Sequence, residues 1–273
     1  MTTGAVEPPA VATTDAPSDG PVCPVTDEQV AAYRRDGFVR VRSVLTRSEA
    51  ARLADAAARA QRQIADFHGR ATFAQLLSVW RQDDVLRGLT LHPALAAIAT
   101  QLAGVPLRLW HDQLLIKAPH NGAATHFHQD APYWPHQGSR CALSAWVALV
   151  DVPVEKGCMS FLPGSHDRQD LRSQNLEDAD DLFSLAPDLR WAARVTLPLR
   201  AGDCTFHNAY TAHTAGPNQT DDPRIAHVVI YVDAETTYTG RRHPITDPLE
   251  LAVGEHLDHE LFPLLPGVSP GTA

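Results

Sequence analysis

The sequence predicts a mainly β domain with flanking helices, arranged as an antiparallel sandwich or barrel. Two observations support this fold class. Helical patterns occupy the first part of the chain, up to Gly104, and short β-like runs follow one another from Pro106 onward. Turn residues such as Pro163-Gly164 and Gly216-Pro217 separate these runs, which lie at 107–117, 141–150, 157–162, 194–199, 203–207 and 224–232. Helices followed by many short strands are typical of a β sandwich or barrel braced by helices.

The helical part has clear start and stop signals. Thr26 and Gln29 have the spacing of a capping box, and Gly37 is a suitable end for the helix that follows. Residues 38–44 alternate apolar and polar side chains, as a half-buried strand does. A second capping box at 46–49 opens a helix that we expect to reach about Phe67, and residues 92–103 form another helix before Gly104.

The chain is expected to form one domain with two tails. Residues 1–24 contain almost no large apolar side chains, so we predict a disordered N-terminal tail. Residues 25–265 form the domain, and 266–273 a flexible C-terminal tail. The polar and acidic segment 167–193 resembles an insertion between strands, and such insertions often act as lids.

Composition excludes several classes of partner. The net charge of −9 argues against nucleic acid and against an anionic membrane surface. Four cysteines without a CxxC pair indicate reduced thiols, and hence a cytoplasmic protein. No apolar run approaches the ~18 residues of a membrane span. We therefore expect a small-molecule substrate as partner, for a monomer or homodimer.

Histidines concentrate where the chemistry is expected, with eight of 14 in residues 111–136 and 207–227. His128 and Asp130 are two residues apart, and on a strand such side chains share a face. With His213 as a distant third ligand they would form two histidines and a carboxylate on one side of a metal, the arrangement of non-haem Fe(II) oxygenases. An HxD pair alone is weak, because it also occurs in surface loops.

Arg224 strengthens this interpretation. It opens an apolar strand eleven residues after His213. A guanidinium at the start of a buried strand needs a carboxylate partner, which could be a bound dicarboxylic acid.

Together these motifs resemble the phytanoyl-CoA dioxygenase family. The resemblance covers roughly residues 28–245 and rests on the HQD of 128–130, the WVALVDV of 146–152, the GCMSFLPGSH of 157–166 and the spacing of His213 and Arg224. It implies a double-stranded β-helix, the cupin-like jelly roll. It also implies Fe(II) as cofactor, with 2-oxoglutarate and O2 as cosubstrates.

The resemblance also implies roles for single residues. His128, Asp130 and His213 would bind iron, and Arg224 would pair with the distal carboxylate of 2-oxoglutarate. Gln129 and Trp146 would line the cosubstrate pocket, and Lys117 would approach it. Ala215 stands where some relatives have serine, so one hydrogen bond to the cosubstrate would be either missing or supplied by Thr214 or Thr205.

Other residues near the motifs keep two interpretations. His126 could touch the substrate or be a packed or solvated side chain, and His207 could support the metal ligands or be an ordinary buried strand residue. Tyr133 and Trp134 could form a substrate wall or pack in the core. We place His111, His120 and His136 outside the metal ligands.

The predicted activity is hydroxylation of a small molecule. The alanine- and arginine-rich composition is typical of high-GC bacteria, which favours a bacterial secondary metabolite. Desaturation, cyclisation and epimerisation are alternative outcomes of the same iron chemistry, whereas Asp130 argues against halogenation. A fatty-acyl-CoA hydroxylase is a further alternative, with a phosphate site made by Arg168, Arg172, Arg241 and Arg242. A non-catalytic jelly-roll binding protein and a zinc hydrolase are the remaining hypotheses, and Arg224 argues against the hydrolase.

Overall fold

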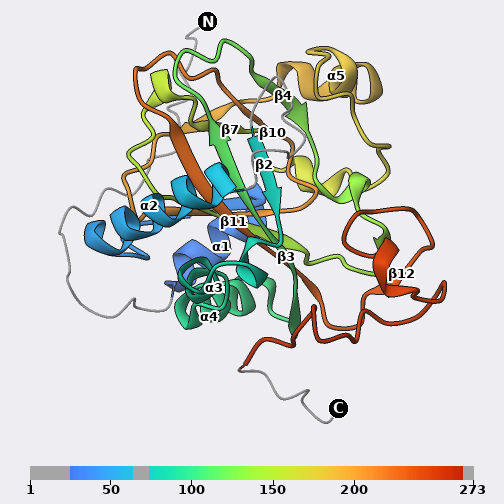
Figure 1. Ribbon diagram of the computed structural model, residues 1–273. Helices are drawn as coiled ribbons and strands as arrows, with labels where there is room; N and C mark the ends of the chain where they lie inside the picture. Colours follow the sequence, from blue (N-terminus) through green and yellow to red (C-terminus); the bar gives the residue numbers. More distant parts are fainter. Residues whose placement is uncertain (1–24, 64–73, 267–273) are drawn as a thin grey trace, which may run out of the picture.

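The computed structural model describes residues 25–63 and 74–266, and its strands form two main antiparallel sheets (Figure 1). The larger sheet has the order β1-β9-β6-β11-β3-β2, with β1 Phe38–Val41, β9 Cys204–Asn208, β6 Leu143–Ala148, β11 Arg224–Asp233, β3 Leu107–Lys117 and β2 Ala74–Leu77. The smaller sheet has the order β4-β10-β7-β8, with β4 Thr125–His128, β10 His213–Ala215, β7 Met159–Phe161 and β8 Val195–Leu197. A separate pair joins β5 His136–Gln137 to β12 Thr237–Tyr238.

In the described part of the chain five α-helices accompany the sheets: α1 Asp27–Asp36, α2 Arg47–Gln63, α3 Asp84–Thr90, α4 Pro93–Ala103 and α5 Asp181–Leu185. Both predicted capping boxes are confirmed. The Thr26 hydroxyl accepts the amide of Gln29, and the Thr46 hydroxyl accepts that of Glu49, each at 3.2 Å. Gly37 ends α1 with φ 85°, a left-handed conformation that glycine adopts readily. The expected end of α2 near Phe67 lies outside the described residues.

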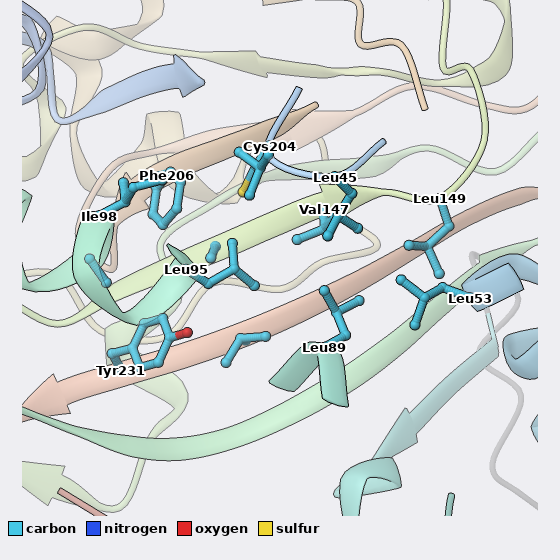
Figure 2. Packing of buried hydrophobic residues seen from close by; sticks show 14 of the residues in the cluster. Leu45, Leu53, Leu89, Leu95, Ile98, Val147, Leu149, Cys204, Phe206 and Tyr231 are labelled. Carbon is cyan, nitrogen blue, oxygen red and sulfur yellow. The ribbon is translucent and has the colours of Figure 1, made fainter. Parts of the chain in front are cut away.

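Helices α1 to α4 cover one face of the larger sheet, where most of the apolar core lies. Every second residue of β6, β9 and β11 points to this face, as strand geometry requires. Figure 2 shows Val147, Phe206 and Tyr231 from these strands against leucines and an isoleucine of α2, α3 and α4. The labelled helix residues are Leu53, Leu89, Leu95 and Ile98. This packing buries one face of the larger sheet against the helices, and its other face remains available for a functional site.

The opposite face of the larger sheet packs against the smaller sheet. Phe38 of β1 stacks on Phe161 of β7 with ring centroids 4.5 Å apart. Apolar residues of both sheets, among them Trp146, Met159 and Val228, form a second core cluster. Two facing antiparallel sheets with helices on one side confirm the predicted mainly β, jelly-roll fold.

The predicted strand bounds agree best with the structure for the long buried strands. β3 has the predicted bounds, and β11 extends one residue beyond them, whereas β6, β7 and β8 are shorter than their apolar runs. The sequence reading missed β2, α3 and the short strand β10. In the segment 167–193, α5 packs through Leu182 and Phe183 into a third small core cluster with Leu162.

Candidate metal centre and active site

Strand pairing brings His128 and His213 together. His128 is the last residue of β4 and His213 the first of β10, and the two are partners in the antiparallel register. Cross-strand partners hold their side chains close on one face of a sheet. The two imidazole centroids lie 4.3 Å apart, although 85 residues separate them in the chain.

Backbone carbonyls fix which nitrogen of each ring faces inward. Nδ1 of His128 lies 2.8 Å from the carbonyl oxygen of His126, and Nδ1 of His213 lies 3.0 Å from that of Thr211. A carbonyl only accepts, so each Nδ1 carries the proton and donates it. Each Nε2 therefore presents a lone pair, the form in which histidine binds metals.

Asp130 completes the group, but not as strand alternation predicted. β4 ends at His128, and Asp130 has helical backbone angles at the start of a 3-10 turn over Ala131–Tyr133. Its amide donates to the carbonyl of Ala209 at 2.9 Å, which holds the turn in place. Asp130 Oδ1 consequently lies 3.6 Å from Nε2 of His128 and 3.8 Å from Nε2 of His213.

The second oxygen of Asp130 is held from the larger sheet. Ser144 of β6 donates its hydroxyl to Asp130 Oδ2 at 3.2 Å, and Nε2 of His207 on β9 lies 3.4 Å from the same oxygen. His207 thus stands behind the carboxylate, and Oδ1 alone faces the two histidines. A metal held by this oxygen and the two nitrogens would keep its other coordination positions for further ligands.

The protonation states suit a divalent metal. The ligand atoms of His128, Asp130 and His213 all lie within 4.8 Å of one another. Burial lowers the pKa of His213 to about 3, and the neighbouring imidazole of His128 adds to this effect. Burial alone would raise the pKa of Asp130, but the neighbouring imidazoles of His213, His128 and His207 hold it well below its usual value. Neutral imidazole and ionised carboxylate are the forms that bind Fe(II).

Arg224 is the second functional feature. It opens β11 and is 2 % exposed, with Nη1 donating to the carbonyl of Gly157 at 3.1 Å. The guanidinium carbon lies 5.6 Å from the ring centre of Trp146, a cation–π contact. Among the described residues Nε has no hydrogen-bond partner and no carboxylate pairs with the side chain. Burial lowers its pKa to about 10, so it stays charged at neutral pH.

A cavity of about 570 Å³ joins Arg224 to the three ligands. It lies between the two sheets, because its walls come from β2, β3, β6, β9 and β11 on one side and β4, β7 and β10 on the other. Trp146, which contacts Arg224, lines it together with Met159 and Ala215. A volume of this size accommodates a drug-sized ligand, for which pockets of ~300–1,000 Å³ are usual.

Three of the residues assigned to the cosubstrate do not line this cavity. The Gln129 amide donates to the carbonyls of Arg168 and Tyr210, at 2.7 and 2.6 Å, and so ties down the segment that begins at 167. The Thr214 hydroxyl donates to the carbonyl of Thr125 at 2.6 Å. Lys117 is the β3 partner of Arg224, but its ammonium donates to the carbonyls of Ala123 and Gly216. Trp146, the fourth residue assigned to the cosubstrate pocket, lines the cavity.

Gly157 shapes the end of the cavity where Arg224 lies. Its φ of 78° is left-handed, and a Cβ atom there would lie 2.3 Å from the carbonyl oxygen of Gly216. The same Gly216 oxygen accepts the Lys117 ammonium at 2.7 Å. Glycine is therefore required at 157 for the close approach that places its carbonyl on Arg224.

Several cavity residues were missed in the sequence. Gln75, Gln113 and His243 line the cavity, as does His111, which we had placed away from the metal ligands. Tyr133, Trp134 and His207 also line it, whereas His126 does not. Alternation along β3 could have indicated His111 and Gln113, because they share a face with Leu115 and Lys117.

Comparison with known proteins agrees with this geometry. The family described as "Phytanoyl-CoA dioxygenase (PhyH)" matches residues 33–226. The phytanoyl-CoA dioxygenase domain-containing protein 1 of Mus musculus is 29% identical over 160 residues, which are 57% of this chain and 55% of that protein. The L-proline trans-4-hydroxylase of Streptomyces griseoviridis is 30% identical over 149 residues, 52% of this chain and 55% of that protein. The chain thus spans about half the length of these curated relatives.

Two solved structures match nearly over their full length. The non-heme alpha ketoglutarate dependent carbocyclase SnoK from nogalamycin biosynthesis superposes with a TM-score of 0.81 and 36% identity, covering 90% of this chain and 99% of its own. The epimerase SnoN, in complex with Fe3+, alpha ketoglutarate and nogalamycin RO, gives a TM-score of 0.77 and 40% identity, covering 88% and 98%. With most of the domain matched by the family and the HxD, distal histidine and arginine in one cavity, this chain belongs to the phytanoyl-CoA dioxygenase family.

Proposed function

We propose that this protein is an Fe(II)- and 2-oxoglutarate-dependent dioxygenase that oxidises a small molecule. His128, Asp130 and His213 hold the iron, and Arg224 binds the distal carboxylate of 2-oxoglutarate. The observation that carries the proposal is the buried, carboxylate-free guanidinium of Arg224 in the same cavity as three converging metal ligands. A zinc hydrolase has no use for such a group.

Bound iron and 2-oxoglutarate would supply the oxidising power for an unactivated C–H bond. The residues of this chain bind and orient. Nδ1 of His128 and Nδ1 of His213 donate to backbone carbonyls, which orients both imidazoles. Ser144 and His207 contact Oδ2 of Asp130 and so orient its Oδ1 toward the two histidines. The burial of Arg224 against Trp146 keeps water from the guanidinium, which strengthens its pairing with a carboxylate. Leu176 lines the cavity from the segment 167–193, which supports a role of that segment as a lid.

The outcome of the oxidation has two candidates. Hydroxylation of a small secondary metabolite is the first, since two curated relatives are named hydroxylases. Ring closure or epimerisation is the second, because the carbocyclase and the epimerase from nogalamycin biosynthesis resemble this chain over 88–90% of its length. Neither outcome changes the roles of the four residues.

The structure gives little support to a fatty-acyl-CoA substrate. Three of the four arginines considered for a phosphate site pair with aspartates. Arg168 lies 2.9 Å from Asp188, Arg172 2.7 Å from Asp181, and Arg242 3.3 Å from Asp247. Phosphates would have to compete with these carboxylates.

Location and partners complete the proposal. Within the described residues no helix combines the length and apolar character that a membrane crossing requires. Cys141, Cys158 and Cys204 are free thiols, which supports a reducing, cytoplasmic location. A small molecule is the expected partner, with the protein a monomer or homodimer.

The test uses iron, 2-oxoglutarate and their products. In the absence of oxygen, the protein with Fe(II) and 2-oxoglutarate should show a weak visible charge-transfer band. With oxygen and candidate metabolites, iron-dependent release of succinate should increase with the true substrate. A protein that binds the metal but never releases succinate would be a binding protein instead.

A further inference from the structure

A polar wall bounds the cavity on the side of β2 and β3. We call Gln75, His111, Gln113 and His243 the distal wall; all four line the cavity. The wall lies at the level of the metal ligands, since Ile230 of β11 is the partner of both Ser144 and His111, and Ser144 contacts Asp130. Strands lie about 4.8 Å apart, so His111 is two strands, or roughly 10 Å, from Ser144. That distance leaves room for a ring system between the wall and the metal ligands.

The wall lies to one side of the path assigned to 2-oxoglutarate. Arg224 pairs with Lys117 of β3, whereas Gln113 and His111 pair with Val228 and Ile230, four and six residues farther along β11. 2-Oxoglutarate would run from the metal ligands toward Arg224, and so away from His111. The imidazole of His111 and the amide of Gln113 are therefore left for a second ligand.

The two imidazoles of the wall offer opposite hydrogen-bonding groups. Nδ1 of His111 lies 3.0 Å from the carbonyl oxygen of Asp112, so it donates and leaves Nε2 as an acceptor. Nδ1 of His243 accepts the amide of Ile245 at 3.2 Å, so its Nε2 carries a proton and donates. Neither Nε2 has a hydrogen-bond partner among the described residues. Trp110 lies 5.5 Å from each of the two rings and restricts them.

The two glutamines add a second pair of groups. Gln75 donates through Nε2 to Oε1 of Gln113, which joins β2 to β3. Whichever amide donates, the pair keeps one carbonyl oxygen and N–H groups unused by that bond. Burial lowers the pKa of both His111 and His243 to about 4, so the whole wall is uncharged at neutral pH. Tyr133 and Trp134 contribute aromatic surface to the same cavity.

We propose that the distal wall binds the substrate through hydroxyl or carbonyl oxygens on an uncharged ring system. A hydroxyl both donates and accepts, and so matches a wall that alternates the two kinds of group. Aromatic surface beside such a wall suits a flat ring more than an aliphatic chain. The inference rests on the proposed function only in taking the bound molecule to be the substrate of that oxidation.

The test compares matched ring compounds with and without hydroxyl groups. The probes are naringenin with flavanone, daidzein with isoflavone, and quinizarin with anthraquinone, titrated into the full chain loaded with Fe(II) and 2-oxoglutarate without oxygen. One or two additional neutral hydrogen bonds should make a hydroxylated member bind about tenfold more tightly than its partner. Palmitoyl-CoA serves as the charged, aliphatic comparison and should bind more weakly than the best hydroxylated ring.

Two substitutions connect any preference to the wall. Gln113→Leu and His111→Phe remove polar groups at similar volume and should reduce the preference for hydroxyl groups to less than about threefold. Gln219→Leu, at an exposed position, is the matched control and should keep it. The affinity for 2-oxoglutarate should be unchanged in all three, which also shows that the variants are folded.

Three outcomes would overturn the inference: no hydroxylated probe binds more tightly than its partner, the preference survives both wall substitutions, or palmitoyl-CoA binds most tightly. These outcomes are separate from failure of the proposed function, which would appear as absence of 2-oxoglutarate binding in the wild type. Binding of the ring compounds would then still be measurable on the metal-free protein.

Discussion

Arg224→Ala should weaken 2-oxoglutarate binding strongly while leaving the metal in place. The guanidinium is 2 % exposed, and one of its nitrogens, Nη1, is used on Gly157. The other guanidinium nitrogens face a cavity in which no described carboxylate other than Asp130 is present. Without the guanidinium, the distal carboxylate of the cosubstrate would enter this site without a partner, because Lys117 is held by two backbone carbonyls.

The size of the effect follows from burial. Removing one partner of a buried ion pair costs about 3–5 kcal/mol, which corresponds to roughly two to three powers of ten in the dissociation constant. Arg224→Lys keeps the charge but loses the fork and one charge-assisted hydrogen bond. It should cost about 1.5–3 kcal/mol, or roughly ten- to a hundredfold. The order wild type, lysine, alanine is therefore part of the prediction.

Calorimetric titration of 2-oxoglutarate into the Fe(II)-loaded protein without oxygen measures these constants. Arg62→Ala, an exposed arginine of α2, is the control and should bind as wild type does. Pyruvate lacks the distal carboxylate, so its weaker binding should be the same in wild type and Arg224→Ala. Equal dissociation constants for 2-oxoglutarate in all variants would show that Arg224 is a structural residue of β11 and would remove the main support for this cosubstrate.

Three further predictions concern the metal, the backbone and pH. His213→Ala should abolish Fe(II) binding in anaerobic equilibrium dialysis, whereas His207→Ala, which loses only a contact to Asp130, should weaken it about 10- to 100-fold; equal losses would mean that His207 is itself a ligand. Gly157→Ala should lower the melting temperature and weaken 2-oxoglutarate binding because of its left-handed φ, while Gly122→Ala, with nothing within 4 Å of its Cβ, should do neither. Burial lowers the pKa of His111 to about 4 and the pKa values of His136 and His227 to about 3. Between these values and the pKa of about 6.5 that histidine has in an unfolded chain, the unfolded protein binds more protons than the folded protein. Asp112, raised by burial to about 7, acts with the opposite sign. The free energy of unfolding of the metal-free protein should therefore fall from pH 6.5 to pH 4.5, by up to about 1.4 kcal/mol per pH unit for each net proton; urea unfolding at several pH values measures this, and a constant or rising stability toward acid would contradict it.

Local patterns predicted the parts of the fold that depend on neighbouring residues. Thr26 and Thr46 cap helices because a capping box is formed within four residues. The bounds of β3 and β11 could be predicted because long strands contain long apolar runs in the sequence. β2 was not, because Ala74–Leu77 is defined by its pairing with a strand some 40 residues later in the chain. The distal wall was missed for the same reason, since Gln75 and Gln113 meet only through that pairing.

Within the site, the sequence indicated correctly which residues come together. It did not indicate which backbone conformation brings them there. Asp130 was selected on the assumption of a continuous strand, yet it reaches the histidines from a turn. Strand alternation indicates that the side chains of Gln129 and Thr214 point away from the cavity. Each follows a cavity-facing histidine by one residue, and each points to the other side. The resemblance to a family supplied the chemistry, but only register and hydrogen bonds separate the cavity residues from their neighbours.

The position of Asp130 between the sheets has a consequence for how the metal centre is held. Its Oδ1 faces histidines of the smaller sheet, and its Oδ2 is held by Ser144 and His207 of the larger one. Arg224 also belongs to the larger sheet, so the ends of 2-oxoglutarate would be bound by different sheets, the keto acid by the metal and the far carboxylate by Arg224. The spacing of the sheets, set by contacts such as the stack of Phe38 on Phe161, would therefore determine whether metal and guanidinium are the right distance apart. Packing residues that touch neither ligand should thus contribute to cosubstrate affinity, because they fix the two surfaces between which 2-oxoglutarate would bind.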